Sequence, residues 1–414
     1  MFRAIINFLK EYKLQLFVIV VSLFCYLIFV YAERHYLTYD TVLSQVPWWN
    51  YIAENGWRGI ATLNYAGMGD YTTIWYFVIA IFTKLHLYPQ FPIEYLIKFL
   101  AVACSLLSAA VVFLIVKHFR PESKYSPVIA ACLTPFLPMF SMDLLKTNLT
   151  DGMYILPSLL SFYFFLKNKK SLSWFVLALG ACFKLMAIYL APVYLFFYIK
   201  DFKKYNLQEK LAPLWGLAAV FLCSLPNVFA GGKLIDGIVT PILGRNDIGE
   251  AMSWFWLIPT SNNFTPAGTA QDMKVMVYGL LILVFFMTFF FIIKYVKKEK
   301  HRLVGLAILP TLSIMLCFYL LPSQHETYFA MAGIFAIIGF FAMPKKELFV
   351  NFLSINIFLF YMYLFGITWW YEEPVWVLPN VQMGLIYLGL IIFNYYIIFK
   401  NSVFYLSSEN NQKK

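Results

Sequence analysis

Isolated charged side chains stand at the edges of long apolar runs in this 414-residue chain. Asp40 follows the first of these runs, Asp151 precedes a later one, and Lys184 lies midway through an otherwise uncharged stretch. A charge beside or within an apolar medium is costly unless it is hydrated or paired, so each of the three is a functional candidate. A carboxylate can accept a proton from an attacking hydroxyl, and an ammonium can bind an anionic phosphate.

Further candidates lie in loops. Asp70 follows two glycines in NYAGMGDY, where a helix N-cap is the alternative role, and Arg245 lies in a polar loop, where it could equally anchor the chain at the membrane surface. His325 and Glu326, in LLPSQHETYF, do not form HExxH because position 329 is Phe, so zinc chemistry is not indicated. We expect no cofactor, and no pairing of carboxylates suggests a divalent metal.

The long apolar runs next to these residues must be membrane helices. Hydrophobic residues make up 61% of the chain and charged residues 13%, and apolar runs of about 20 residues recur throughout. A soluble domain could not bury so much apolar surface, and the runs do not alternate as barrel strands do. The net charge of +11 comes from short loops, so it indicates topology and does not predict nucleic-acid binding.

Most basic residues fall in short segments that alternate along the chain with segments in which acidic residues outnumber basic ones. This alternation predicts which segments are cytoplasmic and which are outside. We expect a single membrane domain over residues 1–414. Both termini are expected in the cytoplasm of a multi-pass membrane protein with about 11 to 13 crossings. The expected crossings are 14–32, 92–116, 125–145, 150–166, a pair within 171–199, 211–230, 274–293, 303–321, 327–344, 348–369 and 380–399.

The run 171–199 has basic loops at both ends, so the orientation rule requires two crossings, each of about 21 Å at 1.5 Å per residue. Lys184 is then at their junction, where it needs an anionic partner, a lipid phosphate or a hydrated exit.

Two long segments, 33–91 and 231–273, are expected on the outer side. The first contains TYDTVLSQVPWWNYIAENGW, in which Val42, Val46, Trp49, Ala53 and Trp57 recur at helical spacing. That helix and the run YTTIWYFVIAIF are too short to span a bilayer. We therefore expect two interfacial helices with aromatic residues at headgroup depth.

Several short segments contain these candidate residues or lie close to them in the chain. They are, in order, Asp40 followed by PWWNYIAENGW, then GDYTTIWY, IEYLIKFL, NLTDGMY, FKLMAIYLAP and LPSQHETYF. In this order they resemble segments of the GT-C superfamily of membrane glycosyltransferases, in particular bacterial relatives of the GPI mannosyltransferases. The resemblance implies an all-α bundle whose first outer loop holds interfacial helices and a catalytic acid, which Asp40 matches. It further implies inverting transfer of a mannose-like or glucose-like hexose from a polyprenyl-phosphate carrier, on the outer membrane face or in the endoplasmic reticulum lumen.

Substrate binding is assigned to the other polar positions: Asp70, Asp151, Lys184, Arg245, His325, Glu326 and Tyr328. The expected partners are the polyprenyl-phosphate sugar donor, a cell-envelope glycan, lipid or protein acceptor, and the bilayer. Two alternatives stay open, a flippase or transporter of lipid-linked saccharides and a polysaccharide polymerase, because polar residues on outer loops suit these functions as well.

Overall fold

The computed structural model describes residues 12–38, 41–63, 71–145, 151–234, 236, 299–320, 326–371 and 380–411, and this part of the chain is helical without strands. Within it, four segments are long and apolar enough to cross a membrane: Lys13–Ala32, Ile93–Phe119, Leu185–Lys204 and Gln382–Asn401. The prediction of an all-α membrane protein is confirmed to that extent, while the larger number of crossings and the single domain stay predictions.

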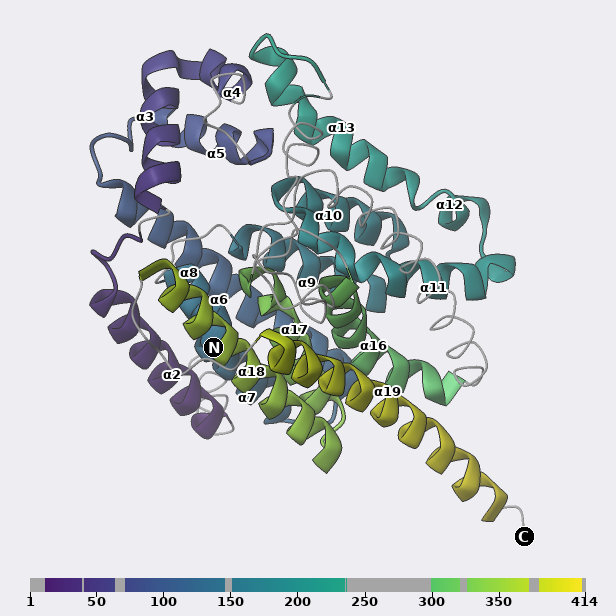
Figure 1. The fold of residues 1–414 in the computed structure, drawn as a ribbon. Coiled ribbons are helices and arrows are strands. Elements are labelled where there is room, and N and C mark those ends of the chain that lie inside the picture. Colours follow the sequence, from purple (N-terminus) through teal and green to yellow (C-terminus); the bar gives the residue numbers. More distant parts are fainter. Residues whose placement is uncertain are drawn as a thin grey trace, which may run out of the picture.

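Four helices of the first half pack in series (Figure 1). Helix α6 (Ile93–Phe119) packs on α9 (Gly152–Leu166), α9 on α10 (Lys170–Phe183), and α10 on α13 (Leu214–Phe229). Helix α2 (Lys13–Ala32) lies at the edge of the bundle against α7 (Ser126–Leu133). Most of its apolar side chains are exposed, as expected for a helix surrounded by lipid.

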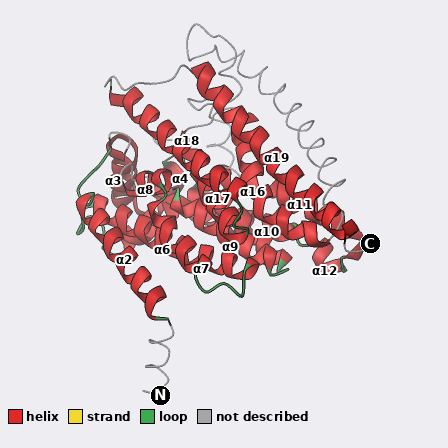
Figure 2. Ribbon diagram, turned by 90° about the horizontal axis from the view of Figure 1, so that it is seen from below, coloured by secondary structure: helices red, strands yellow, loops and turns green. Residues whose placement is uncertain are grey.

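The second half covers this series with α16 (Glu299–Leu320), α17 (Ala330–Ala342), α18 (Lys346–Tyr371) and α19 (Asn380–Asn411). Helix α17 contacts α6 and α7, and α18 packs on both α17 and α19 (Figure 2). Asn351 and Asn394 exchange two amide hydrogen bonds of 3.0 Å between α18 and α19. Because these amides are buried, the pair fixes the register of the two helices.

One expected crossing is interrupted in the structure, and the expected pair within 171–199 is divided near its predicted junction. The segment 125–145 divides into α7, a 3-10 turn at Thr134–Phe136 and α8 (Pro138–Leu145), because Pro135 and Pro138 cannot donate helix hydrogen bonds. The segment 171–199 divides as predicted, into α10, a 3-10 helix at Leu185–Leu190 and α11 (Ala191–Asp201). The expected crossing at 274–293 lies outside the described residues.

The first long loop contains the two short helices expected there, α3 (Val46–Asn55) and α5 (Thr73–Lys84), with α4 (Gly59–Thr62) between them. They form a group at one corner of the molecule in Figure 1, and their aromatic residues Trp48, Trp49 and Trp75 share a buried cluster. The predicted apolar face was wrong in detail. Trp49 of the predicted row is buried as expected, but Val42 and Trp57 are about half exposed. Trp48, which lies outside that row, is buried because α3 packs against α5.

Candidate functional site

The predicted site residues divide by whether the structure describes them. Asp151, Lys184 and Tyr328 are described, and of Glu326 only the backbone is, in a short 3-10 helix at Glu326–Phe329. The remaining four lie outside the described residues: Asp40, Asp70, Arg245 and His325.

Lys184 ends helix α10. Its backbone is extended, with φ −154° and ψ 130°, and its amide donates to the carbonyl of Gly180 at 3.0 Å. The chain then turns into the 3-10 helix at Leu185–Leu190, so Lys184 stands at the break between the two predicted crossings. The predicted junction at Lys184 is confirmed, while its place relative to the membrane stays a prediction. The break directs the side chain of Lys184 across to the neighbouring helix α9.

Asp151 is the anionic partner that Lys184 requires. The Nζ of Lys184 lies 2.6 Å from Oδ1 of Asp151, and the two side chains are 11% and 0% exposed. Asp151 precedes α9, but its side chain caps none of the helix amides. Its second oxygen, Oδ2, is buried and has no hydrogen-bond partner among the described residues. Asp151 therefore forms an ion pair with Lys184 through Oδ1, while Oδ2 can accept a further hydrogen bond.

Two tyrosine rings line the ion pair. The Nζ of Lys184 lies 4.5 Å from the ring centroid of Tyr328 and 5.8 Å from that of Tyr154, within the range of cation–π attraction. The hydroxyl of Tyr154 donates to the carbonyl of Tyr328 at 3.5 Å, which connects α9 to the 3-10 helix before α17. Tyr154 was not among the predicted site residues. Its spacing of three residues from Asp151, on the same helix face, was the available signal.

Close helix packing brings the paired residues together. A Cβ on Gly180 would lie 3.3 Å from the carbonyl oxygen of Tyr154, so this glycine lets α10 approach α9. A Cβ on Gly152 would lie only 2.8 Å from Cβ of Cys104 on α6. Glycine is thus required at the start of α9, directly after Asp151.

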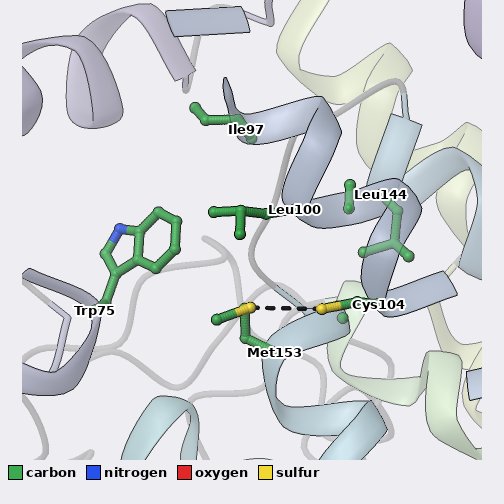
Figure 3. A pocket seen from close by; sticks show the side chains of 8 residues that line it. Trp75, Ile97, Leu100, Cys104, Leu144 and Met153 are labelled. Atoms are coloured by element: carbon green, nitrogen blue, oxygen red, sulfur yellow. Dashed lines mark hydrogen bonds between the residues drawn. The ribbon is translucent and has the colours of Figure 1, made fainter. Parts of the chain in front are cut away.

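Figure 3 shows the small cavity beside this contact, where Trp75 of α5, Leu144 of α8 and Met153 of α9 converge on α6. The Sγ of Cys104 lies 3.5 Å from Sδ of Met153. The cavity has a volume of about 10 Å³, which is at the lower limit for one water molecule. The start of α9 is therefore held firmly between α6 and α8.

The first long loop is attached next to the ion pair. The hydroxyl of Thr72, at the start of α5, donates to the carbonyl of Cys182, two residues before Lys184. The indole of Trp75 donates to Oε1 of Gln45 at 3.1 Å, which joins α5 to the turn before α3. Residues that follow Asp40 and Asp70 in the sequence are thereby connected to the end of α10.

An apolar cavity of about 320 Å³ lies between the α3–α5 group and helices α10 and α13. Trp57, Ile74 and Phe77 line it on one side, and Leu179 of α10 and Phe229 of α13 on the other. Leu179 lies five residues before Lys184 on the same helix. Helix α10 thus contributes Leu179 to the apolar cavity and ends at Lys184 of the buried ion pair.

No cluster of three metal-ligating side chains occurs in the described part of the chain. Comparison with known protein families gives no matching family model, and no curated protein matches the sequence either. A function for the chain is therefore inferred from the geometry of the site and from the resemblance of short sequence segments.

Proposed function

We propose that the protein is a membrane glycosyltransferase that moves a hexose from a polyprenyl-phosphate carrier to a cell-envelope acceptor, with inversion at the anomeric carbon. The observation that carries the proposal is the buried pair of Lys184 and Asp151 at a break between two apolar helices. A buried charge pair among apolar helices is a candidate substrate site.

Lys184 supplies the cation for the donor phosphate. An ammonium has three N–H donors, so it can hold Asp151 and contact a phosphate oxygen at once. When the bond between the anomeric carbon and the phosphate oxygen breaks, negative charge develops on the leaving phosphate. A fixed cation in a poorly hydrated site stabilises that charge more than it would in water. Arg245 and His325 remain candidates for additional contacts.

Asp151 Oδ2 is the group that binds a sugar hydroxyl. A buried carboxylate oxygen without a partner among the described residues accepts a hydrogen bond from a donor that enters the site. The ring of Tyr328, beside Lys184, provides an apolar face for a sugar ring.

The apolar cavity between the α3–α5 group and α13 suits the isoprenoid chain of the carrier. Its side chains are hydrophobic and its Leu179 wall lies on the helix that ends at Lys184. In this proposal the lipid tail occupies the cavity and its phosphate extends toward the end of α10 that carries Lys184.

Asp40 is the proposed general base. It accepts the proton of the acceptor hydroxyl while that oxygen attacks the anomeric carbon, and the polyprenyl phosphate leaves from the opposite side. A base in hydrogen-bond contact contributes about 10² to 10⁴-fold to the rate. The active site is placed on the outer membrane face, where the charge pattern puts the first long loop.

The assay uses purified protein, a polyprenyl-phosphate hexose and membrane-derived acceptors, and it measures release of polyprenyl phosphate. We expect release by the wild type and a loss of at least about 10²-fold in Asp40→Asn, with Glu54→Gln as the control for an exposed acid on α3. Near-normal turnover by Asp40→Asn would refute the assignment of the base. Movement of the intact donor across vesicles without release would favour a flippase, and chain lengthening of an oligosaccharide a polymerase.

A further inference from the structure

Lys98 is a buried cation that the mechanism above does not use. It lies in the second turn of α6 and is 3% exposed, although α6 is one of the helices apolar enough to span a membrane. A lysine in such a place is unfavourable unless its ammonium finds strong hydrogen-bond acceptors.

The acceptors are backbone carbonyls at the ends of two other helices. The Nζ of Lys98 donates to the carbonyl of Leu145, the last residue of α8, at 2.9 Å, and to the carbonyl of Glu33, the C-cap of α2. No carboxylate lies within ion-pair distance of Lys98 in the part of the chain that the structure describes.

Helix C-termini are suitable partners for a buried cation. Their last carbonyls lack intrahelical donors and carry the negative end of the helix dipole. One ammonium thus joins three elements from distant parts of the sequence: the end of α2, the start of α6 and the end of α8.

The two carbonyls also begin the segments that carry the proposed site acids. Asp40 follows Glu33 by seven residues, and Asp151 follows Leu145 by six. We propose that Lys98 is a positioning residue, which fixes the points from which both acid-bearing segments leave the bundle. This role rests on the proposed function, since it concerns the residues that perform the transfer.

The test compares Lys98→Met, Lys98→Arg and, as a matched control, Lys84→Met, which changes an exposed lysine at the end of α5. For Lys98→Met we expect kcat to fall about 10²-fold, as small displacements of reacting groups do, with KM for the donor changed less than about threefold because Lys98 does not contact substrate. Arginine has donors for both carbonyls, so Lys98→Arg should retain kcat within about tenfold.

A second measurement does not depend on activity. Amide hydrogen exchange in the last turns of α2 and α8 should be faster in Lys98→Met than in the wild type, and unchanged in Lys84→Met. Unchanged exchange at both helix ends, or a rise in KM without a fall in kcat, would overturn the positioning role.

The two proposals fail in different ways. If the wild type released no polyprenyl phosphate, the proposed function would fail and the positioning role with it. If the wild type were active and Lys98→Met equally active, the positioning role alone would fail. A fall in kcat together with faster exchange at both helix ends supports it.

Discussion

At the scale of single residues, the ion pair of Asp151 and Lys184 should control both stability and activity. Lys184→Met leaves a fully buried carboxylate without its cation, and breaking such a pair costs about 3–5 kcal/mol. The double variant Asp151→Asn/Lys184→Met removes both charges, so it should regain more than half of the lost stability while transferring no sugar. Thermal unfolding in detergent micelles measures the first effect, and Lys233→Met, at an exposed lysine, is the control.

Recovery of activity in the double variant would contradict this assignment, because it would show that the charges serve packing alone. The sequence indicated that Lys184 needed an anionic partner, and it indicated Asp151 separately. It could not pair them, since 33 residues separate the two and several other acids were available at the same end of the protein. Pairing depends on how α9 and α10 pack, which no local pattern encodes.

At the scale of elements, Gly152 tests whether the contact between α6 and α9 positions Asp151. Gly152→Ala would place a methyl group 2.8 Å from Cβ of Cys104 and 3.1 Å from Cδ2 of Leu144. We expect a loss of about 1–3 kcal/mol from overpacking and slower transfer, because the start of α9 must shift. Gly389→Ala is the control: it meets nothing within 4 Å on α19 and should be neutral or slightly stabilising. Equal effects of Gly152→Ala and Gly389→Ala on stability and transfer rate would contradict a positioning role for the contact between α6 and α9.

A second element-scale prediction concerns α12 (Leu207–Lys210) and the start of α10. Lys170 donates to Oε1 of Glu209 at 2.5 Å, and this bond, helped by the capping box with Asn206, holds the pKa of the Glu209 carboxyl below its ordinary value of 4.5. A lowered folded-state pKa stabilises the fold above the ordinary value, and this contribution is lost as the pH falls through the folded-state pKa.

The thermal unfolding midpoint of the wild type should therefore fall more between pH 7 and the acid range than that of Glu209→Gln. The difference is small because the site is partly exposed and solvent screens the pair. Parallel pH profiles for the two proteins would rule out the contribution of this bond.

Helix positions were more predictable than helix faces. The expected bounds of α2, α6, α9 and α13 agree with the structure within a few residues, because long apolar runs between charged loops specify membrane helices. The buried face of α3 was not predictable: Trp48 is buried by α5, whereas Trp57 at the expected helical spacing is exposed. A tertiary neighbour decides which side of a short aromatic helix is covered.

At the scale of the whole molecule, the charge pattern predicts that both termini are cytoplasmic and the first long loop is outside. Tags at the two ends should be protected from protease added to intact cells and become accessible after permeabilisation, whereas a reporter cysteine in the loop should react with an impermeant maleimide in intact cells. Opposite sidedness of the two termini would contradict the orientation, since the alternation of basic loops requires an even number of crossings.

The structure is consistent with a common location for the site at one end of the bundle. Contacts there join the end of α2, the start of α6, the ends of α8 and α10, and the start of α9. The Lys170–Glu209 contact joins the start of α10 to α12, at the opposite end of that helix. A site at one end of the bundle is the arrangement that the proposed transfer from a lipid-linked donor requires.

The most direct test of the central claim is single-turnover release of polyprenyl phosphate from a polyprenyl-phosphate hexose, measured for the wild type and for folded Asp151→Asn/Lys184→Met in matched nanodiscs. We predict release by the wild type and a rate at least about 10²-fold lower for the double variant, because the leaving phosphate loses its cation. Equal rates for the two proteins, or no release by the wild type with any hexose donor, would contradict the proposed role of this site.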